Sequence, residues 1–425
     1  MTTASYEQLI REPIDNQYKG FPPSETTYTI GTVAAAGWNV LAGDLLLPAL
    51  VLHQDALDHN LALMAKWCAD RNVSLAPHGK TPMAPQLFLR QLQAGAWGVT
   101  AATVSQARIM RSFGVRRIVL ANELVSPVGL RWVAQQLDAD ESFELFCLVD
   151  SAYTADRMAS ILAAAGAVRP LPVLLEVGLP AGRAGVRDDT EALALAEHIA
   201  GLPQLRLAGV EAFEGVAGSN REPVTLAAID AVLGRMTALL TEIDKRGLFD
   251  GDEVLFTAGG SAFFDRVVVA AEQIGTLSRP VRTVLRSGCY VTHDHGSYEV
   301  TSPLRSGGDG PALRPALELW AEVLSTPEPG NAIVGFGKRD VSYDQELPIP
   351  LTWIDAAGTR TDVTGRAKVG KLNDQHAFLR SDLPLRPGDV LTFGIAHPCT
   401  AFDKWRLLPV IDTNTTVVDA IRTFF

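Results

Sequence analysis

Short apolar runs alternate with longer helical patterns over the first 300 residues of the chain. The runs have the length and β-branched content of buried strands, and they fall at 74–80, 98–103, 117–122, 143–149, 172–177, 207–213, 253–259 and 282–288. Between them lie stretches such as VSQARIMRSFG, in which apolar residues recur at i, i+3 and i+4. Several of these stretches end at glycine, which is a helix stop signal. Eight strand–helix repeats predict an α/β fold, a TIM-like (β/α)8 barrel.

An open doubly wound sheet is the alternative to the barrel, but no predicted strand is followed by the dinucleotide-binding pattern G-x-G-x-x-G.

The pattern changes near residue 299, where SPLRSGGDGP forms a turn-rich break. The following segments, among them ALELWAEVLS, PLTWIDA and DVLTFGIAH, are typical of strands separated by Gly, Pro and Asp. We therefore expect an N-terminal extension over 1–45 that packs on the β domain, a barrel over 46–298, and a smaller mostly-β domain over 299–425.

Composition and charge limit the classes of partner. The chain has 425 residues, of which 47% are hydrophobic and 20% charged, as in an ordinary globular protein with a large core. Its 37 basic and 48 acidic residues give a net charge of -11 without any Lys/Arg run, which argues against nucleic acid and anionic membranes as partners. No uninterrupted apolar run approaches the roughly 18 residues of a membrane span.

The polar N-terminus, MTTASYEQLIREPIDNQYKGFPP, does not resemble a signal peptide. The four cysteines, Cys68, Cys147, Cys289 and Cys399, have no framework spacing, which fits a reducing compartment. We expect a cytoplasmic protein.

The first candidate for chemistry lies in LAPHGKTP, residues 75–82, where an apolar run gives way to a loop at Lys80. A loop lysine that extends its amine into water is the ordinary structural alternative. In a closed β/α barrel, however, the active site lies at the carboxyl ends of the strands, so the position favours a lysine that serves as nucleophile or base. We count His78, two residues earlier, among the candidate cofactor-binding residues.

Two glycine-bearing turns follow the last two predicted strands. AGGSAFFD supplies Gly259, Gly260 and Ser261, and LRSGCY supplies Gly288, Cys289 and Tyr290. Backbone N–H groups in such turns form phosphate cradles, although plain turn chemistry is the alternative for each. A strand-end lysine opposite a phosphate cradle favours pyridoxal phosphate as the cofactor. Arg183, in LPAGRAGVR, could face the pyridine nitrogen or a carboxylate, or form a surface ion pair.

The segment AHPCTAFDKW contains a candidate metal site. His397 and Cys399 stand two residues apart at the end of an extended run, so both side chains can point to one side. Imidazole with thiolate suits zinc, and two protein ligands would leave open positions for water or substrate. A buried cysteine beside a loop histidine is the alternative. His376, in LNDQHAFL, could join the site or cap a turn.

Taken together, the motifs PHGKT, GRAGV, AGGSAFFD, RSGCYVTHD and HPCTAFDKWRLLPVID resemble the D-serine dehydratase and D-threonine aldolase family. These enzymes use pyridoxal phosphate in an alanine-racemase-like (fold type III) barrel with a β domain. The resemblance implies that Lys80 carries the cofactor, that the two glycine loops hold its phosphate, and that His397 and Cys399 bind the metal. It also implies a homodimer with a small-molecule substrate.

The last motif separates two chemistries within this family. Dehydratase-type members resemble this chain in having a His and a Cys that flank one residue and bind zinc, whereas aldolase-type members have a His and an Asp flanking a Cys, which suits manganese or another hard ion. The resemblance thus implies dehydration of a D-3-hydroxyamino acid, with aldol cleavage as the alternative and a non-catalytic pyridoxal-phosphate carrier as a third. Phe213, Val216 and the long N-terminal extension depart from the family pattern.

Overall fold

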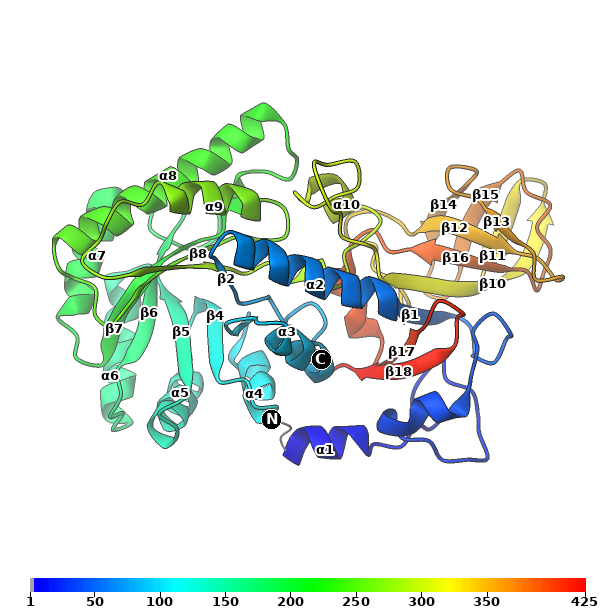
Figure 1. Ribbon diagram of the computed structural model, residues 1–425, viewed down its shortest axis with the longest axis horizontal. Helices are drawn as coiled ribbons and strands as arrows, with labels where there is room; N and C mark the ends of the chain where they lie inside the picture. Colours follow the sequence, from blue (N-terminus) through cyan, green and yellow to red (C-terminus); the bar gives the residue numbers. More distant parts are fainter. Residues whose placement is uncertain (1–3) are drawn as a thin grey trace.

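The computed structural model describes residues 4–425, and its centre is a ring of eight parallel strands (Figure 1). The strands are β2 (Ser74–Leu75), β3 (Val99–Ala101), β4 (Arg117–Glu123), β5 (Glu144–Val149), β6 (Leu171–Val177), β7 (Leu205–Ala212), β8 (Val254–Ala258) and β9 (Val281–Leu285), in the order β2-β9-β8-β7-β6-β5-β4-β3. A parallel bridge between His78 and Thr100 joins the two ends of this sheet. The predicted barrel is therefore confirmed, and each of the eight predicted runs overlaps one strand.

Helices follow the strands and cover the outside of the ring (Figure 1). They are α3 (Pro85–Gln93), α4 (Val104–Ser112), α5 (Pro127–Ala139), α6 (Ala152–Ala164), α7 (Asp189–Ala200), α8 (Pro223–Lys245) and α9 (Phe264–Glu272), with α2 (Gln54–Asp70) before the first strand. Short polar side chains start several of them. Ser151 accepts from the N–H of Thr154 at α6, and Asp188 accepts from two N–H groups at α7.

Helix α8 has the length and apolar composition of a membrane span. Its apolar side nevertheless lies in the protein core, where Ile229, Leu233 and Met236 are almost completely buried. On the other side, Asp230 pairs with Arg266 of α9. The hydrophobicity of α8 is thus explained by its packing on the barrel.

The second sheet is mostly antiparallel and contains the C-terminal strands together with one strand from the N-terminal part. Its strands are β1 (Ala49–His53), β10 (Leu317–Glu328), β11 (Asn331–Val334), β12 (Ile349–Ile354), β13 (Arg360–Asp362), β14 (Ala367–Leu372), β15 (Ala377–Ser381), β16 (Val390–Gly394), β17 (Leu407–Ile411) and β18 (Val417–Arg422). Strand β1 pairs with β10 and β17, although the sequence placed it in the barrel segment. The chain therefore enters the barrel only at α2.

The residues before β1 pack on this second sheet. They include the short helix α1 (Ala4–Ile10) and the 3-10 helix η1 (Ile30–Ala36). Leu9, Ile30 and Val33 share a buried cluster with Trp320 and Val417. The N-terminal segment thus covers one face of β10, β17 and β18.

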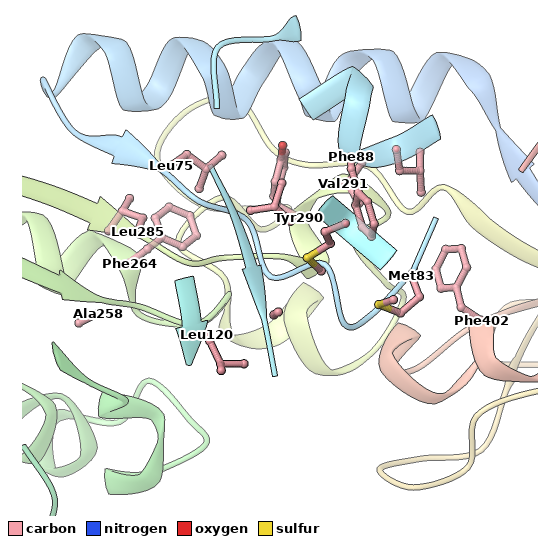
Figure 2. Packing of buried hydrophobic residues seen from close by; sticks show 14 of the residues in the cluster. Leu75, Met83, Phe88, Leu120, Ala258, Phe264, Leu285, Tyr290, Val291 and Phe402 are labelled. Carbon is pink, nitrogen blue, oxygen red and sulfur yellow. The ribbon is translucent and has the colours of Figure 1, made fainter. Parts of the chain in front are cut away.

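A continuous core joins the barrel to the second domain. In Figure 2, Tyr290 and Val291 lie among buried side chains from β2, α3, α9 and β9, and Met83 lies beside Phe402 of the C-terminal region. All of these side chains belong to one hydrophobic cluster. This packing holds the C-terminal motif beside the carboxyl ends of the barrel strands.

Candidate active site

A cavity of about 850 Å³ lies at the carboxyl ends of the barrel strands. Its walls come from both domains, because the turn containing Lys80 and the loops after β8 and β9 meet His397 and Cys399 there. Ligand sites in closed β/α barrels are expected at this end of the strands. The cavity is therefore the candidate active site.

Most of the residues predicted from the sequence line this cavity. They are His78, Lys80, Arg183, Gly259, Gly260, Ser261, Gly288, Cys289, His397 and Cys399. Tyr290 is not among the lining residues, because its ring is directed into the core, where burial raises the pKa of its phenol (Figure 2). His376 lies in the exposed turn between β14 and β15, where its carbonyl accepts from the N–H of Asn373, and it does not line the cavity.

Backbone hydrogen bonds of the two residues before Lys80 fix the position of this segment. The N–H of His78 donates to Arg286 O at 3.1 Å, and the N–H of Gly79 donates to Thr100 O at 2.8 Å. Within residues 4–425, the amine of Lys80 makes no hydrogen bond or ion pair. Burial, reinforced by the charges of Lys80 and Arg286, holds the pKa of His78 well below its usual range. A free lysine amine thus stands beside a neutral imidazole.

The loop after β8 already has a hydrogen-bond acceptor within the protein. The N–H groups of Gly259 and Gly260 donate to the two carboxylate oxygens of Glu214, at 2.9 and 3.1 Å. Glu214 is fully buried at the start of the 3-10 helix η2 (Glu214–Ala217). The amides therefore converge on one acceptor group, as a phosphate cradle requires, but a phosphate could use these two N–H groups only by displacing Glu214.

The two glycine loops contact each other and the lysine segment. Ser261 Oγ accepts from the N–H of Cys289 at 3.2 Å, and Ser287 Oγ donates to Gly260 O at 2.8 Å. A Cβ at Gly288 would lie 2.3 Å from the carbonyl oxygen of His78, so only glycine permits this approach. Ser261 and Gly288 thus line the cavity together with Lys80.

Buried carboxyl groups form the floor of the cavity. Arg286 pairs with Glu211, and it also donates to Thr257 Oγ1 at 2.9 Å. Burial raises the pKa of Glu176 to about 10, which leaves this carboxyl protonated at neutral pH. One side-chain atom on each of Glu176, Glu211, His78 and His295 is buried without a hydrogen-bond partner among the described residues. A polar ligand in the cavity would satisfy such atoms.

Arg183 supplies a positive charge to the wall of the cavity. Its guanidinium lies 4.6 Å from the ring centroid of Phe213, a cation–π contact. In the described part of the chain, Arg183 forms no ion pair, so the surface ion-pair alternative does not describe it. Phe213 lines the cavity, whereas Val216 does not.

His397 and Cys399 belong to a cluster of sulfur, imidazole and carboxylate groups. Cys399 lies in the 3-10 helix η4 (Pro398–Thr400), and its Sγ is 3.3 Å from Sγ of Cys289 in the 3-10 helix η3 (Cys289–Val291). This contact lowers the pKa of Cys289 to about 6 and raises the pKa of Cys399, because the remaining S–H donates to the thiolate. Asp344 Oδ2 lies 2.7 Å from Nδ1 of His397.

The donor set fits zinc in its chemistry. One imidazole and one thiol suit a borderline-soft ion, and the contact of Nδ1 with Asp344 leaves Nε2 of His397 for a metal. Among residues 4–425, no three His, Cys, Asp or Glu side chains form a metal-binding group. His397 and Cys399 would thus leave several positions open.

Sequence reasoning missed several residues of this site: Asp344, Glu214, Glu211, Arg286 and Tyr298. The charged residues inside two apolar runs, Glu176 and Glu211, were visible signals, because a charge in a buried strand needs a partner or a function. Arg286 directly precedes the SGCY turn. Asp344 and Tyr298 carry no such signal, since only the fold brings them to His397.

The fold and this cavity define the class, an alanine-racemase-like barrel enzyme with a second, mostly-β domain. Residues 52–299 match the family model described as alanine racemase, N-terminal domain, and residues 316–411 match the one described as putative serine dehydratase domain. The chain belongs to the D-serine dehydratase and D-threonine aldolase family within that class. Enzymes of the alanine-racemase-like family use pyridoxal phosphate.

Curated relatives of this chain include both kinds of lyase. A D-threonine aldolase of an Arthrobacter species is 29% identical over 335 residues, which cover 78% of this chain and 79% of that protein. A D-threo-3-hydroxyaspartate dehydratase of a Delftia species is 28% identical over 303 residues, which cover 70% of this chain and 73% of that protein. The chain is therefore similar to lyases of both reaction types.

Solved structures of both kinds have the same fold. The D-threonine aldolase from Filomicrobium marinum superposes with a TM-score of 0.75 at 26% identity, covering 91% of this chain and 96% of that one. The Delftia D-threo-3-hydroxyaspartate dehydratase superposes with a TM-score of 0.70 at 22% identity, covering 91% of this chain and 99% of that one. At that identity, the second likeness concerns the fold alone.

Proposed function

We propose that the protein is a pyridoxal-phosphate- and zinc-dependent dehydratase, an ammonia-lyase acting on a D-3-hydroxyamino acid. D-serine, D-threonine and D-3-hydroxyaspartate are the candidate substrates, and the products would be a 2-oxo acid and ammonia. One observation carries this proposal: a single cavity joins the free amine of Lys80, two glycine loops and the His397–Cys399 pair.

Each wall of the cavity has a task in this reaction. When bound, pyridoxal phosphate supplies an electron sink for charge at the substrate Cα, and zinc supplies a Lewis acid for the departing hydroxyl group. Ser261 and Gly288 help to hold the phosphate beside Lys80. The amine of Lys80 attaches the cofactor and, once released, takes the α-proton at Nζ. Arg183 offers a cation to the substrate carboxylate or to the pyridine ring.

The sulfur ligand favours zinc over manganese, and by the family resemblance a zinc site favours dehydration over aldol cleavage. Bound to a metal ion, Cys399 would lose its proton and supply a soft thiolate, and such a ligand selects zinc over hard ions such as manganese. The His-Pro-Cys motif also resembles the dehydratase-type pattern rather than the aldolase-type one. A metal near the substrate would assist elimination, because hydroxide is a poor leaving group.

Aldol cleavage to glycine and an aldehyde is the second candidate. The similarity to the Arthrobacter D-threonine aldolase, at 29% identity, favours it. In that reaction the Cα–Cβ bond breaks and the α-proton stays on the substrate. The two reactions therefore give different products from the same compound.

Product analysis tests the proposal. The purified protein, loaded with pyridoxal phosphate and zinc, should release 2-oxo acid and ammonia from D-serine, D-threonine or D-3-hydroxyaspartate. Chelation or Cys399→Ala should abolish this release and leave the visible cofactor absorbance and α-proton exchange in place. Release of glycine and aldehyde without any oxo acid would establish the aldolase instead, and cofactor binding without turnover of any substrate would favour a carrier.

Assembly and compartment belong to the same proposal. We propose a cytoplasmic homodimer, as the family resemblance implies. Sedimentation analysis of the purified protein measures the mass directly, and a mass of one chain would contradict the dimer.

A further inference from the structure

Two thiols from distant parts of the chain meet in the cavity. Cys289 and Cys399 are separated by 110 residues, yet their sulfur atoms are 3.3 Å apart. Both residues line the 850 Å³ cavity, and Cys399 is the more exposed of the two. The sulfurs would have to approach by little more than about 1 Å to reach the disulfide bond length of about 2.05 Å.

The other two cysteines have no such neighbour. Cys68 is buried in α2 and Cys147 in β5, and neither lines the cavity. Within the described residues, all four cysteines are free thiols. The proximity of Cys289 to Cys399 is therefore a property of this site, and it has no role in the proposed lyase reaction.

We propose that Cys289 and Cys399 form a reversible disulfide when the protein meets hydrogen peroxide, and that this bond removes Cys399 as a metal ligand. Disulfide formation itself needs neither turnover nor a bound metal, so it stands apart from the proposed function. Only the loss of metal binding rests on that function.

Hydrogen peroxide oxidises the two thiols in two steps. One sulfur of the pair, as its thiolate, attacks peroxide: an S–O bond forms, the O–O bond breaks, and water leaves with the proton of that thiol. The other sulfur then attacks the sulfenic acid: the S–S bond forms, the S–O bond breaks, and a second water leaves with the second thiol proton. In total, two thiols and one hydrogen peroxide give one disulfide and two waters, and the sulfurs transfer two electrons to the peroxide.

A zinc ion would oppose this oxidation. A thiolate that binds a metal has its reactive electron pair engaged, so it is a weaker nucleophile towards peroxide. The two states of Cys399, metal-bound and disulfide-bonded, exclude each other. The pair would thus link the oxidation state of the surroundings to the metal content of the site.

The test uses the full chain loaded with pyridoxal phosphate, with zinc and after chelation, exposed to hydrogen peroxide. Thiols are counted after denaturation, and peptides are mapped by mass spectrometry without reduction. The metal-free protein should lose two of its four thiols, a linked Cys289–Cys399 peptide should appear, and dithiothreitol should restore both thiols. Added zinc should slow the loss several-fold.

Two variants sharpen this test. Cys289→Ser, or Cys289→Ala if the serine variant does not fold, should give no disulfide and should leave Cys399 as a sulfenic acid that dimedone labels. Cys147→Ser is the matched control and should form the disulfide at the wild-type rate. An absent Cys289–Cys399 peptide in the metal-free wild type would overturn the proposal. If that peptide forms and zinc gives no protection, the disulfide stands and the zinc assignment fails.

Discussion

Nδ1 of His397 lies 2.7 Å from Oδ2 of Asp344, and Thr400 Oγ1 donates to the other oxygen of the same carboxylate at 2.9 Å. Asp344 therefore holds the imidazole through one nitrogen, and Nε2 has no hydrogen-bond partner within residues 4–425. Carboxylates in this position orient histidine ligands and raise their basicity. The geometry makes Asp344 a positioning residue for the proposed metal site.

Asp344→Asn should weaken zinc binding about 10- to 100-fold, the usual effect of losing such a partner. Competition with a chromogenic chelator measures the zinc affinity, and the visible spectrum of the cofactor should stay unchanged. Asp403→Asn is the matched control, because Asp403 lies nearby on the surface and pairs only weakly with Lys404 at 3.4 Å. Equal zinc affinity in the Asp344 variant and the control would contradict the positioning role.

Lys80→Ala should abolish covalent attachment of the cofactor and lower turnover by about 10²- to 10⁴-fold, the range attributed to a positioned proton-transfer group. Its amine is free in the cavity, so no structural contact is lost. Borohydride reduction followed by peptide mapping should locate the cofactor on Lys80 in the wild type and in Lys66→Ala, whose lysine is a surface residue paired with Asp70. Labelling of another lysine would refute the assignment.

Gly260→Val should weaken cofactor binding without unfolding the barrel. A Cβ at this position already lies 3.1 Å from Cε2 of Phe213, so the methyl groups would enter the cavity wall. Overpacking of about 1–3 kcal/mol corresponds to a loss of affinity of about 5- to 150-fold. Titration with pyridoxal phosphate measures the cofactor affinity of the variant. Gly275→Val is the control, because nothing lies within 4 Å of a Cβ at that position. Normal cofactor affinity in both variants would contradict the assignment of Gly260 to the phosphate-binding loop.

Much of the fold follows from local pattern. An apolar run is typical of a barrel strand because a parallel sheet can bury both of its faces, as in β6, where all seven residues are buried. Residues 49–53, which form β1 of the second sheet, lie inside the predicted barrel range because their apolar sequence, ALVLH, fits either sheet. Its pairing with β10 is decided by residues more than 260 positions away, which no local pattern reports.

The candidate site was predictable where one short segment carries its chemistry. Lys80, the two glycine loops and the His-Pro-Cys motif all line one cavity, whereas the ring of Tyr290 does not, because the η3 turn directs it into the core. Glu214 was not foreseen as the partner of the Gly259 and Gly260 amides, since that contact joins segments 45 residues apart. Contacts between loops form only once the ring of barrel strands is closed, so they cannot be predicted from the local sequence pattern.

Glu214→Gln should lower both stability and cofactor affinity. An amide offers one acceptor oxygen, so one of the two glycine N–H groups would lose its partner at a cost of about 1–3 kcal/mol. Urea unfolding and pyridoxal phosphate titration measure the two effects, with Glu222→Gln, on the exposed loop before α8, as the control. A variant that binds inorganic phosphate more tightly than the wild type would show instead that Glu214 only occupies the phosphate position.

Glu176 should make the stability of the protein depend on pH. Burial, followed by a hydrogen bond that Glu176 donates to Glu123 and the charge of Glu211, raises the pKa of Glu176 from 4.5 to about 10, so the folded state keeps a proton that the unfolded state releases. The sign follows from linkage: this contribution to stability is complete below about pH 4.5 and is lost as the pH rises towards about 10.

Glu176→Gln, which resembles the protonated carboxyl, should therefore flatten the fall in unfolding free energy between pH 5 and pH 10. Urea denaturation at several pH values measures this slope. Glu191→Gln, on the exposed side of α7, should keep the wild-type slope. Identical slopes in all three proteins would mean that Glu176 is ionised in the folded state, and that Arg286 or another cation compensates its charge in the cavity.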